Sequence, residues 1–208
     1  MRPHVFLIPG YLGFRGKQGY SGYWDAVEPI LTAHGFTCHT VMTERVAIVA
    51  RRARTLRNTI VKACGNNDGA PIHLVGHSMG CRVALASALR RPERVDAVAL
   101  VDGSRFAGGN GPSAYNDALA SVEAAGGWPV LVRHLFKQMF TEKAPASLRQ
   151  RVIDRALAIP EAVGRAGFAS MVAWDVQQLD STLRSFVRPL TVIQSTYVNE
   201  ERNRVSIR

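Results

Sequence analysis

The feature that most constrains this chain is the pentapeptide Gly-His-Ser-Met-Gly at residues 76–80. An apolar run at residues 72–75 precedes it, and residues 81–91 have a helix-forming composition. When a strand turns sharply into a helix, a serine at the turn is strained and exposed, and flanking glycines leave room for neighbouring chain. The helix end also favours developing negative charge. The pattern predicts that Ser78 is a nucleophile; the alternative is a chance match in a loop.

The first part of the chain alternates strand-like and helix-like segments. We expect strands at residues 5–9, 36–42, 72–76 and 95–102, helices at 24–34 and 43–64, and a helix from Met79 that stops before Pro92. Another strand is expected at residues 190–194. This alternation predicts an α/β fold with a parallel sheet of about five strands and helices on both faces.

A long segment of the chain departs from this alternation. Residues 112–184 show helical periodicity and no convincing strand. We therefore expect a core formed by residues 1–111, a helical insertion at residues 112–184, and a last core strand with its tail at residues 185–208.

The overall composition excludes several classes of protein. A chain of 208 residues can form one domain with a small insertion. It has no apolar run of about 18 residues, so we expect no stable membrane insertion.

The net charge is +10, but the arginines are spread along the chain, and we expect no nucleic-acid partner. We interpret the one dense cluster as a solvated helix face, with attraction to an anionic surface or substrate as the alternative. The cluster comprises Arg45, Arg51, Arg52, Arg54 and Arg57.

The cysteines argue against a disulfide framework or a zinc site. Cys38, Cys64 and Cys81 are odd in number and have no Cys-x-x-Cys spacing. Free thiols of this kind are typical of a reducing compartment, so we expect a cytoplasmic protein. Cys81 is expected to pack in the helix after Ser78 as a small hydrophobic residue. We expect no metal and no cofactor.

The order of strand, Gly-rich loop, serine turn, helix, strand, helical insertion and strand resembles the α/β-hydrolase superfamily. Residues 5–14 look like the start of the bacterial triacylglycerol lipases. Residues 91–95 and 100–104 look like the capped esterase, haloperoxidase and C–C hydrolase group. The resemblance implies an α/β-hydrolase core whose helical insertion forms a cap over the active site.

The resemblance also implies roles for particular residues. Ser78 would attack a carboxylic ester, and the backbone N–H groups of Tyr11 and Met79 would form the oxyanion hole. Asp102, which ends the strand after the serine helix, is the preferred catalytic acid, and Glu200 is the fallback. Asp102 is equally well explained as a turn-forming residue.

The cap would supply the apolar walls of a pocket for a small ester or acyl substrate. Phe136, Met139 and Trp174 are the candidates, and the alternative is that each belongs to the core of the cap.

Other functions remain open at this stage. They are a C–C hydrolase, a cofactor-free haloperoxidase, and a truncated or non-catalytic relative that binds an acyl-like ligand. The glycines at positions 10, 13 and 16 also permit a dinucleotide-binding alternative, although their spacing differs from the usual fingerprint.

The sequence departs from the family in ways that bear on catalysis. The family's His-Gly dipeptide is Pro9-Gly10 here, which affects how that loop is anchored. No histidine follows residues 190–194, although a serine nucleophile needs a base. We therefore expect a fragment of a longer hydrolase whose locus encodes roughly 50–80 further residues, with a strand followed by a histidine. The 208-residue chain is expected to be a feeble esterase that self-associates.

His134 is the only histidine after Ser78, and we predict that it is not the base. It lies in a helical stretch beside Arg133, and no motif places it near the serine. His134→Ala should leave the rate of p-nitrophenyl ester hydrolysis unchanged. Loss of hydrolysis in a variant that keeps its circular dichroism spectrum would contradict this expectation.

Overall fold

The computed structural model describes residues 2–10, 24–41, 47–65, 69–105, 111–140 and 142–194. These residues fall into two compact units. The sheet unit comprises the described chain up to Ser104 together with Leu179–Gln194, and the helical unit comprises the described part of Arg105–Gln178.

A five-stranded sheet organises the sheet unit, and every neighbouring pair of strands is parallel. The strands are β1 (His4–Ile8), β2 (Thr37–Thr40), β3 (Ile72–His77), β4 (Ala97–Val101) and β5 (Leu190–Ile193). Their order across the sheet is β2-β1-β3-β4-β5. The predicted parallel sheet is therefore confirmed.

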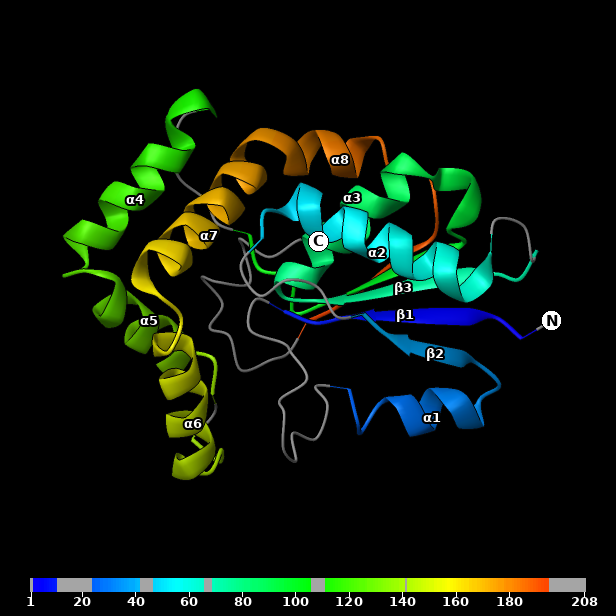
Figure 1. Ribbon diagram of the computed structural model, residues 1–208, viewed down its shortest axis with the longest axis horizontal. Coiled ribbons are helices and arrows are strands. Elements are labelled where there is room, and N and C mark those ends of the chain that lie inside the picture. The colour runs from blue at the N-terminus through cyan, green and yellow to red at the C-terminus, as the bar shows by residue number, and fades with distance from the viewer. Residues whose placement is uncertain are drawn as a thin grey trace. The chain divides into compact units, whose positions relative to one another are not determined.

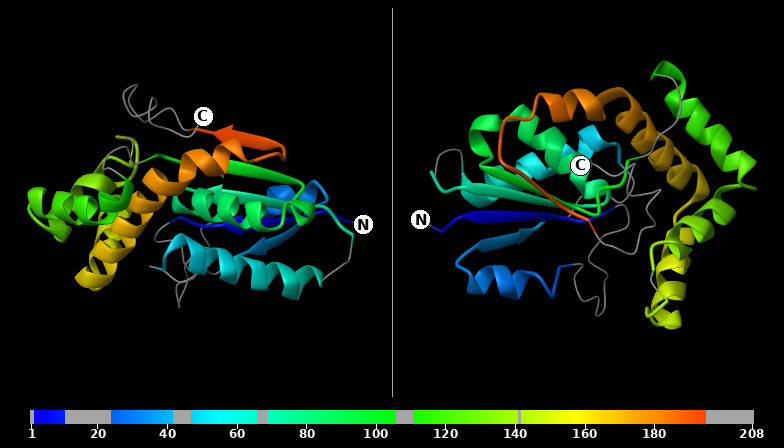
Figure 2. Two further views of the ribbon diagram at one scale, coloured as in Figure 1. Left: turned by 90° about the horizontal axis from the view of Figure 1, so that it is seen from above. Right: turned by 180° about the vertical axis from the view of Figure 1, so that it is seen from behind.

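Helices cover both faces of this sheet. They are α1 (Glu28–Ala33), α2 (Val49–Cys64), α3 (Met79–Arg90) and α8 (Asp180–Arg184). Helix α1 lies on one face, and α2, α3 and α8 lie on the other (Figures 1 and 2). A short 3-10 turn, Pro92–Arg94, follows α3 and leads into β4.

The central strands form the core because both of their faces are covered. Four consecutive residues of β1, from Val5 to Ile8, are buried, as expected for a strand inside a parallel sheet. Leu74 of β3 and Leu100 of β4 are also fully buried. Each such side chain contributes about 1.5–3 kcal/mol when it leaves water.

Two helices are shorter than the sequence predicts. Helix α2 begins at Val49, and the preceding residues 47 and 48 are not helical, whereas residues 42–46 lie outside the described chain. Residues 24–27 form a turn, and α1 begins only at Glu28. Pro29 explains this start, because proline suits the first helical turn, where no amide donor is needed.

The described part of the helical unit contains helices and no strand. The helices are α4 (Ala114–Ala124), α5 (Trp128–Lys137), α6 (Ala146–Leu157) and α7 (Glu161–Trp174). A π-helical segment, Asp175–Leu179, follows α7 and leads back to the sheet unit. The Trp128 ring packs so closely on α7 that only a glycine fits at position 164.

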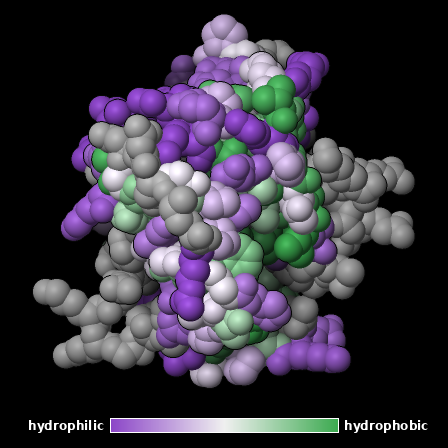
Figure 3. Space-filling model, turned by 90° about the vertical axis from the view of Figure 1, so that its right-hand side faces the viewer, coloured by the Kyte–Doolittle hydropathy of each residue, from purple (hydrophilic) through white to green (hydrophobic). Residues whose placement is uncertain are grey.

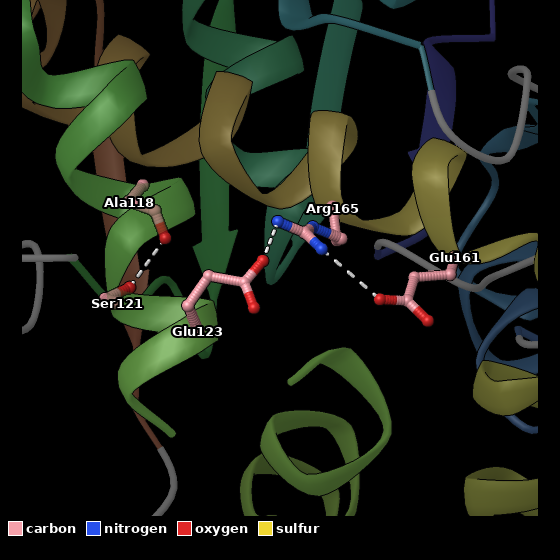
Figure 4. Close-up of polar contacts among 5 residues, drawn as sticks. All are labelled: Ala118, Ser121, Glu123, Glu161 and Arg165. Atoms are coloured by element: carbon pink, nitrogen blue, oxygen red, sulfur yellow. Dashed lines mark hydrogen bonds and ion pairs between the residues drawn. The ribbon is translucent and has the colours of Figure 1, made fainter. Parts of the chain in front are cut away.

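An arginine links two helices of this unit. Arg165 of α7 bonds to Glu123 of α4 and, at 3.4 Å, to Glu161 one turn earlier in its own helix (Figure 4). Both carboxylates are more than half exposed. Water and salt screen such pairs, so they contribute at most about 1 kcal/mol each, and apolar packing between α4 and α7 contributes more.

Candidate active site

Ser78 occupies the turn between the end of β3 and the start of α3. Its backbone is in a rare conformation for a residue with a side chain, with φ 53° and ψ −117°. A backbone in such a sparsely populated region costs about 1–3 kcal/mol, so the surroundings must impose it. One restraint is the Ser78 N–H, which donates to the Val101 carbonyl at 2.9 Å.

The two glycines of the motif allow this turn by close approach of backbone to backbone. A Cβ at Gly76 would lie 2.4 Å from the carbonyl oxygen of Gly80. A Cβ at Gly80 would lie 2.3 Å from the carbonyl oxygen of Ile8, the last residue of β1. Both distances are far below van der Waals contact, so these positions admit only glycine.

The first turn of α3 supplies hydrogen-bond donors next to Ser78. Met79 is the first residue of this 12-residue helix and is fully buried. The first N–H groups of a helix have no partner within it and carry partial positive charge. The second predicted donor, Tyr11, lies outside the described residues.

Asp102 lies immediately after β4 and also has a positive φ, 48°. Its Oδ2 is 3.8 Å from Nε2 of His77, the last residue of β3. Its N–H donates to the Ile193 carbonyl of β5 at 2.8 Å. The structure therefore brings Asp102 to the end of the strand that carries Ser78, whereas Glu200 lies outside the described residues.

The partner of Asp102 is a histidine to which the sequence analysis gave no role. Burial lowers the pKa of His77 below its ordinary value, and the charge of Asp102 opposes this shift. His77 is therefore mostly neutral at pH 7. Its ring lies edge-on to the buried Trp24, with 6.4 Å between the ring centroids. The only sequence signal was its position directly before Ser78.

Arg52 is the exception to the predicted solvated helix face, because Arg51, Arg54 and Arg57 are exposed and Arg45 lies outside the described residues. This residue of α2 is 1% exposed. One of its terminal nitrogens donates to the carbonyls of Pro9 at 3.1 Å and Gly10 at 3.2 Å. Arg52 thus anchors the segment after β1, where the family's His-Gly dipeptide is replaced. The sequence spacing did indicate that Arg52 is buried, because position 52 lies on the same helix face as Val49 and Leu56.

Two neighbouring residues of α3 hold the serine turn in place. Arg82, which is 1% exposed, donates to the Ser104 carbonyl at 2.6 Å and to the Ser78 carbonyl at 3.4 Å. The Cys81 thiol is buried and donates to the Gly76 carbonyl. Burial raises the pKa of Cys81 to about 12, so this thiol is not a nucleophile at neutral pH.

The predicted substrate-binding residues all belong to the helical unit. Phe136 of α5 is half-buried, Met139 is 44% exposed, and Trp174 at the end of α7 is 7% exposed. Their role as pocket walls stays a prediction. His134 is an exposed residue of α5, and its Nε2 lies 2.7 Å from Nε2 of Gln138.

The described residues hold no group of three or more His, Cys, Asp or Glu side chains able to bind a metal ion. None of the described helices is both long enough and apolar enough to cross a membrane.

Comparison with known proteins identifies the class of this chain. A model of the alpha/beta hydrolase family matches residues 5–205, and the chain therefore belongs to this family. The predicted superfamily and fold are thereby confirmed. A search of curated proteins found no match.

Several solved structures share the fold. A hydrolase from Pseudomonas aeruginosa PA01 is 21% identical, with a TM-score of 0.66 over 98% of this chain and 77% of that one. MenH from S. aureus is 15% identical, with a TM-score of 0.67 over 98% of this chain and 78% of that one. An extracellular alpha/beta-hydrolase from a Paenibacillus species is 20% identical, with a TM-score of 0.60 over 94% and 78% of the two chains.

The close approach at Gly80 generates a stability prediction. Gly80→Ala should lower the free energy of unfolding by more than about 2 kcal/mol, because backbone must move to admit the methyl group. Gly35→Ala is the matched control: its φ is +88°, but no atom lies within 4 Å of a Cβ there, so its cost should be about 1 kcal/mol. Urea denaturation measures both. Equal losses would show that crowding at position 80 is unimportant.

The contacts of Arg52 generate a second prediction. Arg52→Ala should lower the free energy of unfolding by about 1–3 kcal/mol, because the carbonyls of Pro9 and Gly10 lose a buried donor. The neighbouring, exposed Arg51 is the control, and Arg51→Ala should change stability by less than about 0.5 kcal/mol. If both variants had the same free energy of unfolding as the parent protein, Arg52 would not anchor this segment.

Proposed function

We propose that this chain is a serine hydrolase that acts on carboxylic esters, with Ser78 as its nucleophile. The observation that carries the proposal is the backbone of Ser78, which has a positive φ between a parallel strand and a helix. The structure maintains a strained serine at this turn, and such strain commonly marks functional sites. Membership in a hydrolase family supports the same conclusion.

The reaction would be acyl transfer to water in two steps. The Ser78 oxygen attacks the ester carbonyl, and its proton passes to a base that Asp102 orients. The backbone N–H of Met79 stabilises the oxyanion, together with the N–H that the family resemblance assigns to Tyr11. The base returns this proton to the alcohol as it leaves, and then takes a proton from the water that releases the acid from the serine.

The proposed substrate is a small ester, and the helical unit supplies the residues proposed to bind its acyl part. Phe136, Met139 and Trp174 are apolar, which suits an acyl chain; Phe136 is half-buried, Trp174 is buried and Met139 is exposed. We propose Asp102 as the acid because its carboxylate lies at the end of β3, next to the serine turn.

A second candidate is a protein that binds an acyl-like ligand without turnover. The contact between Asp102 and His77 favours it, because this carboxylate already faces a ring from β3. The histidine after Ser78 in the sequence is His134, which is exposed on α5. A serine without an activating base is a weak nucleophile.

A fluorophosphonate probe tests the proposed nucleophile. We expect slow covalent labelling at Ser78, located by peptide mass spectrometry, and no labelling of Ser78→Ala. Ser104→Ala is the matched control, because Ser104 is an exposed serine near the same strand ends. Labelling that survives Ser78→Ala would refute the assignment, and ligand binding without any labelling would favour the second candidate.

The same assay separates the two candidate acids. Asp102→Asn should slow labelling if Asp102 orients the base, and Glu200→Gln should leave the rate unchanged. The opposite result would transfer the role to Glu200.

A further inference from the structure

The sheet unit contains a cavity that has no part in the proposed hydrolysis. It lies between α2 and the end of α3 and has a volume of about 390 Å³. Small-molecule sites commonly have volumes of this order. Five arginines line it: Arg54 and Arg57 of α2, Arg90 and Arg91 at the end of α3, and Arg94 of the following 3-10 turn.

The cavity is far from the serine turn. Ser78 precedes the first residue of α3, and Arg90 is its last residue. A helix rises about 1.5 Å per residue, so the two ends of α3 are about 18 Å apart. The ends of α2 and α3 that carry the cavity lie toward the face shown in Figure 3, and hydrophilic side chains gather in the upper part of that view.

The electrostatics of the lining favour an anion. Among the residues that the structure describes, the lining includes five guanidinium groups and no carboxylate. Arg91 has Glu93 at 3.5 Å, but both partners are 58% exposed, and such a pair compensates little charge. Several like charges around one hollow create a positive potential that attracts anions.

A buried hydroxyl adds a second, independent observation. Ser87 of α3 lines the cavity and is only 8% exposed. Its Oγ is buried and has no hydrogen-bond partner among the described residues. A buried polar group without a partner is unfavourable, and rotation of the Ser87 side chain would allow its hydroxyl to bond to a ligand oxygen in the cavity.

The rest of the lining is apolar and indicates the remainder of the ligand. Ile60, Val61 and Val95 contribute aliphatic side chains. Guanidinium groups bind phosphate through paired hydrogen bonds, and their planar faces stack on aromatic rings. We propose that this cavity is a binding site for a small organic phosphate, with the phosphate on the arginines and Ser87 and an apolar or aromatic part against the aliphatic wall.

Isothermal titration calorimetry with ADP and, separately, inorganic diphosphate tests this site. We expect one ADP per chain, and inorganic diphosphate should compete with it. The double variant Arg57→Gln/Arg90→Gln should weaken ADP binding about tenfold or more, because each lost charged hydrogen bond carries roughly that factor. The control double variant Arg133→Gln/Arg151→Gln removes the same charge from exposed positions of the helical unit and should leave binding unchanged.

Loss of ADP binding through unfolding must be distinguished from loss of the site. Thermal melts should show that both double variants are folded, as expected for exposed side chains. Ser87→Ala should weaken ADP binding, and Ser78→Ala should not, because the cavity and the serine turn are separate.

Three outcomes would overturn the proposal. The first is no ADP binding at millimolar concentration. The second is equal weakening by the two double variants. The third is much tighter binding of a single-stranded oligonucleotide that the control variant also weakens, which would indicate a diffuse nucleic-acid surface.

Discussion

The structure of the site depends on one close contact between backbones. The first turn of α3 lies against the carbonyl end of β1, and Gly80 is in direct contact with Ile8. This contact fixes the direction in which the chain leaves β3, and it therefore fixes the strained turn at Ser78. The contact is made by backbone atoms alone. Side-chain packing of the neighbouring helices must therefore hold β1, β3 and α3 together.

Two buried arginines complete the support of this region. Arg52 reaches from α2 to the carbonyls after β1, and Arg82 reaches from α3 to the carbonyl of Ser104 beyond β4. Loops at the ends of parallel strands leave carbonyl groups without ladder partners, and a guanidinium has enough donors to satisfy several of them. Both side chains act on the segments that flank the serine turn, one on each neighbouring strand of β3.

The sequence predicted the framework well and the supporting contacts poorly. The alternating segments were sufficient to predict the parallel sheet, and the glycine–serine motif was sufficient to predict the position of Ser78, because both follow from local patterns. The burial of Arg52 and the pairing of Asp102 with His77 depend on which strands become neighbours. A charge on a helix is usually solvated, so composition alone gave the wrong environment for Arg52. The late start of α2 could likewise not be read from periodicity.

The path of the chain between the two units affects which parts of the sequence can change in evolution. The chain leaves the sheet unit after Ser104, shortly beyond β4, and returns to it at Leu179, before β5. The strands on either side of this excursion, β4 and β5, pair directly with each other. Changes in the length or sequence of Arg105–Gln178 therefore need not alter the register of β4 and β5, and the carbonyl of Val101 in β4 still restrains the serine turn. In this architecture, the helical unit can change while the pairing of the strands stays the same.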